Sequence, residues 1–320
     1  MWLLLLVLLA FAILYRWNRQ RKMLKNLADK YVLITGCDSG FGNHLAKSLD
    51  KQGMQVLAAC LTNTGAEALK KEASSRLQTV ILDVTDSQSV KSAVLWVTGI
   101  VGDTGLWGLV NNAGTTIPSA PNEWLTKEDF WKVLNVNLLG TIDVTLALLP
   151  LIRKSRGRII NMSSVMGRLA FIGGGYSISR HGVEAFSDSL RRELQPFGVR
   201  VSVIEPTTYR TPATDLKATL ESIHAIWNKC PKHIQTSYGQ QYFLDYCKII
   251  RHKLSKCNPH VSQVTDCMEH ALTAVYPWTR YSAGWKTKLF YLPLSYFPTV
   301  VSDYLLRHSF SRPKFSDSIN

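Results

Sequence analysis

The feature that most constrains the fold of this 320-residue sequence is an alternation of short apolar runs with helix-like segments, which begins near residue 30. The runs are rich in Val, Ile and Leu and lack strict polar alternation, as strands buried on both faces do. Helical patterns such as NHLAKSLDKQG (43–53) separate most of them. Repeated βα units predict a parallel, doubly wound sheet with right-handed crossovers. The predicted strands are residues 30–36, 54–60, 78–84, 106–112, 157–164 and 199–206, with a final strand expected in KLFYLPL at 288–294.

The length suits one large α/β domain or two small ones, and no linker or repeat interrupts the chain. We therefore expect a single domain over residues 30–320, preceded by a hydrophobic membrane anchor at 1–17 and a basic linker at 18–29. Residues 207–280 lose the βα rhythm and are expected to form a helical lid over the substrate site. The interleaved aromatic and aliphatic residues of the tail, within 288–320, suit either a second membrane contact or an ordinary packed helix.

The N-terminal stretch MWLLLLVLLAFAILY is almost wholly apolar and is followed at once by Arg16, Arg19, Arg21 and Lys22. It has neither a basic region before it nor a small-residue cleavage site, which argues against a removable signal peptide. A full span of an average bilayer takes about 20 residues. This shorter stretch fits a thinner endoplasmic reticulum membrane or a monotopic insertion. The basic residues on its C-terminal side predict a cytosolic domain.

The net charge is strongly positive, with 37 Lys and Arg against 23 Asp and Glu, which gives +14 and an isoelectric point near 9.5. Such an excess favours nucleic acid or an anionic membrane surface as a partner. No zinc-finger, RNA-binding or basic-helix pattern accompanies the charge, so we expect a membrane and no nucleic acid. The six cysteines show no Cys-x-x-Cys pair and no His/Cys ligand spacing, and we expect no metal site.

The first predicted strand ends in the glycine-rich turn TGCDSGFG at 35–42. Glycines allow the backbone to turn tightly and to approach a pyrophosphate, which then lies over the positive end of the following helix. A glycine-rich turn alone is weak evidence for a nucleotide. Its position between a first strand and a helix makes a nucleotide-binding, Rossmann-type sheet the natural interpretation.

Four further motifs follow in a fixed order: NNAG at 111–114, NVN at 135–137, NMSS at 161–164 and YSISR at 176–180. Together with the glycine turn they resemble the short-chain dehydrogenase/reductase family, and the resemblance covers residues 30 to about 210. DKYVLITGCDSGFGN, GLWGLVNNAG, SVMGRLA, GVEAFSDSLRREL, TDCMEHAL and TRYSAGW are similar to the microsomal retinol and 3α-hydroxysteroid dehydrogenase branch. That similarity extends over nearly the whole chain.

The resemblance implies a role for each motif residue. Tyr176 would be the general base that takes the alcohol proton, with Arg180 as its basic partner, and Ser164 would hydrogen-bond the substrate oxygen. Asn137 would hold a helix kink and a water in the proton path. Cofactor contacts would come from Gly36, Ser39, Gly40, Phe41, Gly42, Asp83 at the adenine, Asn111, Ala113 and Gly114 at the ribose, Tyr176, Arg180, and Thr211 at the carboxamide.

The choice between NAD and NADP follows from the charges near the adenosine ribose. NADP needs a cation near the 2′-phosphate, in the glycine turn or after the second strand. These places hold CDSG and CLTNTG, which contain neither Lys nor Arg. An acidic residue after the second strand, which would select NAD, is missing too. We therefore expect NAD, with NADP left open.

Two residues depart from the family pattern. Arg180 stands where the family has lysine, and Thr207 in EPTTYRT stands where the family has glycine. A free tyrosine ionises near pH 10, so a positive charge beside it is needed for base chemistry at neutral pH. Arginine keeps that charge but cannot pass a proton along a relay. A β-branched side chain at 207 would crowd the cofactor or force an unfavourable backbone dihedral.

We therefore expect a membrane-anchored, NAD-dependent oxidoreductase that interconverts a hydrophobic alcohol and its carbonyl, with reduced turnover. Retinol or a 3α/17β-hydroxysteroid is the expected substrate class, by resemblance. The alternative is a catalytically silent homologue that binds cofactor or lipid. The sequence leaves open the retinoid or steroid preference and whether the chain forms homo-oligomers.

Overall fold

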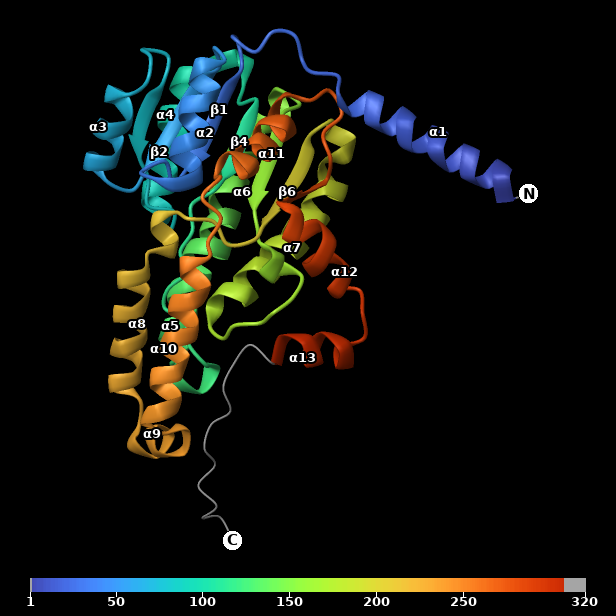
Figure 1. Cartoon of the computed structure of the whole chain (residues 1–320). Coiled ribbons are helices and arrows are strands. Elements are labelled where there is room, and N and C mark those ends of the chain that lie inside the picture. Colours follow the sequence, from blue (N-terminus) through green and yellow to red (C-terminus); the bar gives the residue numbers. More distant parts are fainter. Residues whose placement is uncertain (1, 308–320) are drawn as a thin grey trace.

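The computed structural model describes residues 2–307, and at its centre lies a seven-stranded parallel sheet (Figure 1). The strand order is β3-β2-β1-β4-β5-β6-β7, with parallel pairing throughout. The strands are β1 (Tyr31–Thr35), β2 (Gln55–Cys60), β3 (Gln78–Ile81), β4 (Gly108–Asn111), β5 (Arg158–Met162), β6 (Arg200–Pro206) and β7 (Arg280–Ala283). The order reverses at β1, where the chain crosses to β4. The predicted doubly wound sheet is confirmed.

Helices cover both faces of the sheet, because the strand residues alternate between two apolar clusters. Val32 and Ile34 of β1 lie in one cluster and Leu33 lies in the other. One face packs against α2 (Gly40–Lys51), α3 (Asn63–Lys71) and α11 (Ser262–Thr273). The other packs against α4 (Ser87–Val101), α6 (Gly140–Lys154) and α7 (Gly175–Leu194). Strands buried on both faces explain why the sequence shows continuous apolar runs.

The region between β6 and β7 is helical, as expected, but it divides into two parts. The helices α8 (Leu216–Lys229), α9 (Lys232–Tyr238) and α10 (Gln240–Ser255) extend beyond the carboxyl ends of the strands (Figure 1). They share an apolar cluster with Trp124, whose ring lies 4.7 Å from that of Trp227. The last part, α11, packs instead on the sheet. The helical cover thus ends before residue 262.

The final strand is not the one that the sequence predicts. Residues 288–294 form a π-helical turn (Thr287–Tyr291) and a short helix, α12 (Leu292–Leu294), whereas β7 is Arg280–Ala283. An apolar run without alternation does not distinguish strand from helix. The real strand escapes detection because it is short and carries a charge. Arg280 is tolerated there because Glu184, Glu205 and Asp188 surround its guanidinium.

Shorter and peripheral elements complete the fold. A helix from Lys127 to Lys154 joins α5 (Lys127–Leu134) to α6 through a π turn, and by length and composition it is apolar enough to cross a membrane. It packs against the sheet and belongs to the core. The 3-10 turns are Gly102–Thr104, Asn122–Trp124, Val165–Gly167, Gln195–Phe197 and Pro212–Thr214, and the π turns are Asn135–Leu139 and Thr287–Tyr291.

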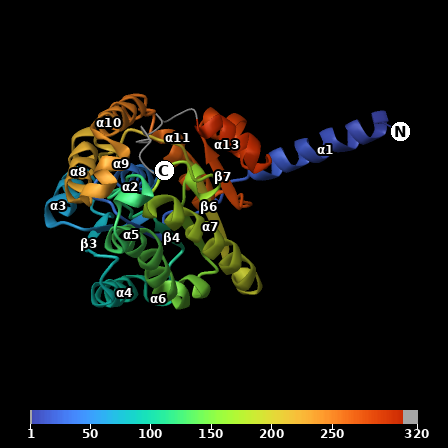
Figure 2. The same cartoon turned by 90° about the horizontal axis from the view of Figure 1, so that it is seen from below.

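The two terminal helices lie on one side of the domain. The helix α1 (Trp2–Gln20) projects away from the sheet, and α13 (Thr299–Arg307) lies at the same side in both views (Figures 1 and 2). Apolar side chains of α1 are exposed, among them Leu4 at 65%, Phe11 at 67% and Leu14 at 59%. The part of the tail segment from 308 to 320 lies outside the described residues.

Candidate active site

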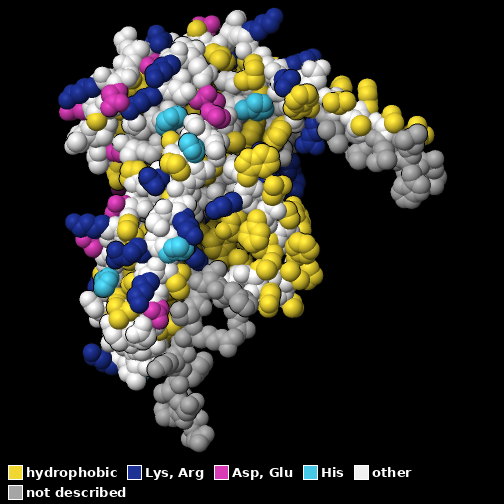
Figure 3. All heavy atoms as spheres, in the orientation of Figure 1, with side chains coloured by type: hydrophobic (Ala, Val, Ile, Leu, Met, Phe, Trp, Pro, Cys, Tyr) yellow, Lys and Arg dark blue, Asp and Glu magenta, His cyan; other side chains and the backbone are white. Residues whose placement is uncertain are grey.

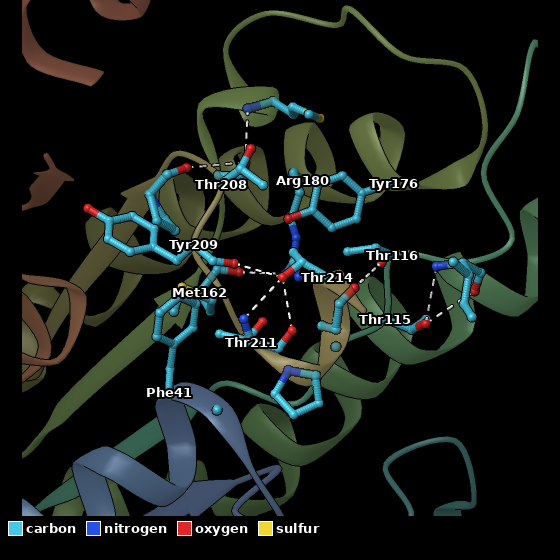
Figure 4. Close-up of a pocket in the computed structure, with 18 of the residues that line it drawn as sticks. Phe41, Thr115, Thr116, Met162, Tyr176, Arg180, Thr208, Tyr209, Thr211 and Thr214 are labelled. Atoms are coloured by element: carbon cyan, nitrogen blue, oxygen red, sulfur yellow. Dashed lines mark hydrogen bonds between the residues drawn. The ribbon is translucent and has the colours of Figure 1, made fainter. Parts of the chain in front are cut away.

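A cavity of 1170 Å³ opens at the carboxyl ends of the strands, beside the point where the strand order reverses. In parallel α/β sheets this edge is where ligands bind. Figure 4 shows side chains from several of these segments around it. The residues that follow six strands line it: Gly36 after β1, Leu61 after β2, Leu82 after β3, Asn112 after β4, Ser163 after β5 and Thr207 after β6.

The glycine turn forms one wall of the cavity. Gly36 and Gly40 have φ of +70° and +62°, which only glycine adopts without strain, and both line the cavity with Ser39 and Phe41. Gly42 does not line it. A Cβ on Gly42 would lie 2.4 Å from the carbonyl oxygen of Gly36, so this glycine lets α2 pack closely on the turn.

The N-terminus of α2 points its backbone amides toward this wall. The N-cap, Ser39, makes no side-chain hydrogen bond to them, whereas Thr62 and Asp86 cap α3 and α4. Uncapped amides and the positive end of the helix dipole form a site for an anion such as a pyrophosphate.

Two carboxylates lie at the far end of the cavity. Asp83, after β3, lines it, and its Oδ1 accepts bonds from the backbone amide (2.9 Å) and the hydroxyl (2.7 Å) of Thr85; its contact with the adenine stays a prediction. Asp38 is a residue that sequence reasoning missed. Its carboxylate accepts bonds from the amides of Leu61 (2.7 Å) and Thr62 (2.9 Å), which follow β2. A carboxylate therefore lies at the end of β2, although the segment CLTNTG (60–65) that follows this strand contains no acidic residue.

The negative charge of Asp38 raises the pKa of a neighbouring thiol. Burial raises the pKa of the Cys60 thiol to about 12, and the carboxylate of Asp38 adds to that rise. The basic residues that line the cavity come from elsewhere, on or after α7, α10 and β7. The end of the cavity between Asp38 and Asp83 is therefore acidic.

Asn111 is not part of the cavity, contrary to the sequence prediction. It is the buried last residue of β4, and its Nδ2 donates to Thr145 Oγ1 and Asn161 Oδ1, both at 2.8 Å. Its side chain therefore points into the layer beneath the sheet. Asn112, Ala113 and Gly114 line the cavity, and Asn112 holds the glycine turn by donating to the carbonyls of Thr35 (2.9 Å) and Gly36 (3.1 Å).

Asn137 lies in the π turn of the long helix, where the sequence predicts a kink, but outside the lining of the cavity. Its Oδ1 accepts from the amide of Thr115 (2.8 Å), and its Nδ2 donates to the carbonyl of Thr115 (2.9 Å) and to Ser179 Oγ (3.0 Å). Thr115 lines the cavity. The amide of Asn137 therefore fixes the loop after β4 to α7, and its role toward a water stays a prediction.

Tyr176 and Arg180 lie on one face of α7, as a spacing of four residues on a helix requires. The guanidinium carbon of Arg180 lies 5.0 Å from the centre of the Tyr176 ring, and Figure 4 shows the two side chains side by side. Arg180 is buried, and its Nη1 donates to the carbonyl of Met162 at 2.7 Å. Gly114 makes room for it, because a Cβ there would lie 2.8 Å from Arg180 Nη2.

Ser164 lines the same cavity just after β5. Its Oγ accepts from the amide of Met166 at 3.2 Å and donates to the carbonyl of Pro206 at 3.3 Å. The second bond is long, so the hydroxyl hydrogen can turn toward a ligand at small cost. Ser164 and Tyr176 thus present hydroxyl groups to one space.

Three other tyrosines line the cavity, and burial raises the pKa of each: Tyr209 to about 12, and Tyr246 and Tyr291 above the ordinary value. The Tyr209 hydroxyl also donates to Gln263 Oε1 at 3.1 Å. Such groups are poor bases at neutral pH. The ring of Tyr176, in contrast to these raised pKa values, has the guanidinium carbon of Arg180 5.0 Å from its centre.

Thr207 and Thr211 line the cavity from the segment after β6. Arg156 is the only non-glycine residue between 2 and 307 with a positive φ, so the backbone of Thr207 is not in the left-handed region. The expectation of an unfavourable dihedral at this position is therefore wrong. Thr211 is held by a bond of 3.0 Å from its amide to Thr214 Oγ1. The other expectation, that the Thr207 side chain crowds the cofactor, stays a prediction, since Thr207 lines the cavity.

The family model described as short chain dehydrogenase matches residues 30–221, and the chain belongs to this family. It is 54% identical to 17-beta-hydroxysteroid dehydrogenase type 6 of Homo sapiens over 313 residues, which cover 98% of this chain and 99% of the relative. It is 55% identical to retinol dehydrogenase 16 of Mus musculus over 314 residues, again 98% and 99% of the two chains. A short-chain dehydrogenase from Streptomyces avermitilis, 24% identical, shares the fold with a TM-score of 0.68 over 87% of this chain and 95% of that one.

Membership in this family implies a nicotinamide cofactor, NAD or NADP, and the cavity fits one. The uncapped amides of α2 suit the pyrophosphate. Gly114 leaves room for the Arg180 guanidinium beside the cavity, and the buried Nε of Arg180 has no hydrogen-bond partner among the described residues. The resemblance predicted from the motifs is confirmed, and the chain is a short-chain alcohol dehydrogenase.

Proposed function

We propose that this protein interconverts a hydrophobic secondary or allylic alcohol and its carbonyl with NAD, at a membrane. The observation that carries the proposal is the meeting of Tyr176, Ser164 and Arg180 in a cavity of 1170 Å³ that also receives the glycine turn. A retinoid or a hydroxysteroid is the substrate class, since the relatives at 54–55% identity are named for retinol and 17-beta-hydroxysteroids.

Each residue of the site has its own role in the proposed reaction. A bound nicotinamide cofactor supplies the carbon that exchanges hydride with the substrate. Tyr176 Oη takes the alcohol proton during oxidation and returns it during reduction. The hydroxyl of Ser164 donates to the substrate oxygen and stabilises its negative charge. The guanidinium of Arg180 stabilises the phenolate, because it lies over the ring and out of water.

The test of this function is NADH formation by the full chain with NAD and a panel of retinol, a 3α-hydroxysteroid and a 17β-hydroxysteroid. We expect turnover of at least one of them, with a smaller rate for short water-soluble alcohols. NADH binding without any turnover over the panel would contradict the proposal and indicate a catalytically silent homologue. Arg180 and Thr207 lead us to expect a modest rate.

We propose NAD as the cofactor because of Asp38. Its carboxylate stands at the end of β2, where the ribose of the adenosine half lies in this fold, and one of its oxygens accepts a single bond from the chain. It would accept a bond from a ribose hydroxyl and repel a 2′-phosphate. Asp83 adds to this repulsion.

Replacing Asp38 by asparagine is expected to reduce the preference for NADH over NADPH by about tenfold or more, because the repulsion of the phosphate disappears. The amide keeps an oxygen that can accept from Thr62. Dissociation constants from nucleotide fluorescence measure this without turnover. Asp86→Asn, at an exposed carboxylate that caps α4 outside the cavity, is the matched control. An unchanged ratio in Asp38→Asn would mean that Asp38 does not select the cofactor.

We further propose that α1 anchors the protein in the endoplasmic reticulum membrane with the domain in the cytosol. The exposed apolar side chains of α1 and the basic residues from Arg16 to Lys25 support this.

A further inference from the structure

The C-terminal segment presents a continuous apolar face to the outside. Figure 3 shows hydrophobic side chains gathered where α12 and α13 lie. Monomeric soluble proteins rarely expose apolar patches of this kind without a partner. The face, here called the C-terminal face, consists of Trp285 (77% exposed), Leu289 (69%), Phe290 (47%), Tyr296 (77%), Phe297 (56%), Val300 (78%), Val301 (39%), Tyr304 (66%) and Leu305 (45%).

This face is fixed to the domain by defined contacts. The ring of Tyr291 stacks on Phe171 with centres 5.5 Å apart, and Leu294 is fully buried. Arg168 Nη2 donates to the hydroxyl of Tyr296 at 2.7 Å. The exposed side chains therefore belong to an ordered surface whose inner side is packed.

The C-terminal face borders the mouth of the cavity. Trp285, Tyr291 and Leu306 line the cavity on this side, together with Phe171 and Ile172 from the loop before α7. An apolar ligand that reaches the cavity along this face meets these aromatic and aliphatic side chains, beside Lys286.

The anchor helix leaves the domain on the same side. Both α1 and α13 lie on the right of the domain in Figure 1, α1 near the top and α13 lower down, and Figure 2 shows them on the same side. The base of α1 is tied to the chain end of α11 by backbone bonds from Leu24 to Thr273 (2.8 Å) and from Val275 to Lys22 (2.7 Å). Arg19 also lies over the ring of Tyr276, 3.9 Å from its centre. The point where α1 ends and the chain enters the domain is thus fixed by these contacts.

We propose that the C-terminal face lies in the boundary between headgroups and acyl chains of the bilayer that α1 enters, so that the cavity opens into lipid. The inference rests on the proposed function, since it assumes α1 as anchor and a hydrophobic alcohol as substrate. A substrate dissolved in the membrane then enters the cavity without crossing water.

The chemistry of the face selects a bilayer over a protein partner. Trp and Tyr side chains concentrate at membrane interfaces, where a ring meets acyl chains and its polar atom meets water. Lys286 and Lys288 flank the face and attract anionic headgroups, against a single acid in the segment, Asp303. The net positive charge of +14 acts in the same direction.

Photocrosslinking identifies the occupant of the face without any need for activity. A benzoylphenylalanine is placed at Leu289 or Val300 of the full chain, in vesicles of phosphatidylcholine and phosphatidylserine. The control position is Leu95, which is 74% exposed on α4, on the side away from α1 (Figures 1 and 2). We expect lipid adducts at 289 and 300 and few at 95, by mass spectrometry. Crosslinks to a second copy or to residues 308–320, or equal lipid adducts at 95, overturn the proposal.

The kinetic consequence is measured with Leu289→Asp combined with Val300→Asp. Neither side chain lines the cavity, so the chemistry is left intact. The KM for an alcohol dissolved in vesicles is expected to rise about tenfold, because two charges oppose insertion, and the KM for a water-soluble alcohol should stay unchanged. Equal changes for both alcohols, or the same effect from Leu95→Asp, contradict it. If no alcohol is turned over at all, the proposed function fails. The pattern of lipid adducts still shows whether the C-terminal face contacts the bilayer.

Discussion

Replacing Tyr176 by phenylalanine is expected to lower kcat by about 10²- to 10⁴-fold, the usual contribution of a positioned acid or base. The substitution removes only the hydroxyl. The ring still packs on α7 under the guanidinium of Arg180, so the walls of the cavity are unchanged. We therefore expect the dissociation constant of NADH, measured by fluorescence, to remain close to that of the unaltered protein.

Tyr209→Phe is the matched control for this prediction. Tyr209 lines the same cavity, but its hydroxyl is bound to Gln263 and its pKa is raised to about 12 by burial. Removal of that hydroxyl should change kcat by less than about tenfold, since a phenol that stays protonated at neutral pH takes no proton from a substrate. A loss of equal size in both variants would show that Tyr176 has no special role.

The parts of the site that the sequence predicts well depend on local spacing. Tyr176 and Arg180 must share a face because they are four residues apart on a helix, and Gly36 and Gly40 must form a turn because they follow a buried strand. The sheet itself follows from runs such as 54–60, whose residues alternate between two apolar clusters. In these cases the pattern and the contact lie within a few residues of each other.

The errors concern contacts between distant segments. Asp38 lies in the glycine turn, yet its carboxylate acts at the end of β2, which only the packing of β1 beside β2 reveals. Asn111 and Asn112 are neighbours in one motif, but the alternation of side chains along β4 sends the first into the core. The strand β7 is recognisable only from the acids that surround Arg280, and these come from α7 and β6.

Arg180→Met is expected to lower kcat by about 100-fold or more, because it removes the positive charge that faces the Tyr176 ring in a buried site. Methionine fills part of the volume but loses the bond from Nη1 to the carbonyl of Met162. Arg180→Lys retains the charge, and we expect it to keep kcat within about tenfold of the unaltered enzyme or above it. The measurement is kcat against pH for the three proteins, with thermal unfolding as a check on folding.

The pH profile separates a role in charge from a role in packing. If the guanidinium stabilises the phenolate, its loss makes deprotonation of Tyr176 harder, and the acid limb of the Arg180→Met profile moves to higher pH. Arg168→Met is the control, since it removes the same charge from a side chain outside the cavity lining that lies 3.5 Å from Glu205 rather than over Tyr176. We expect Arg168→Met to lower the stability of the fold, because it leaves Glu205 with one partner fewer, and not to shift the dependence of kcat on pH. An unshifted profile in Arg180→Met would mean that Arg180 supports the loop after β5 and takes no part in the activation of Tyr176.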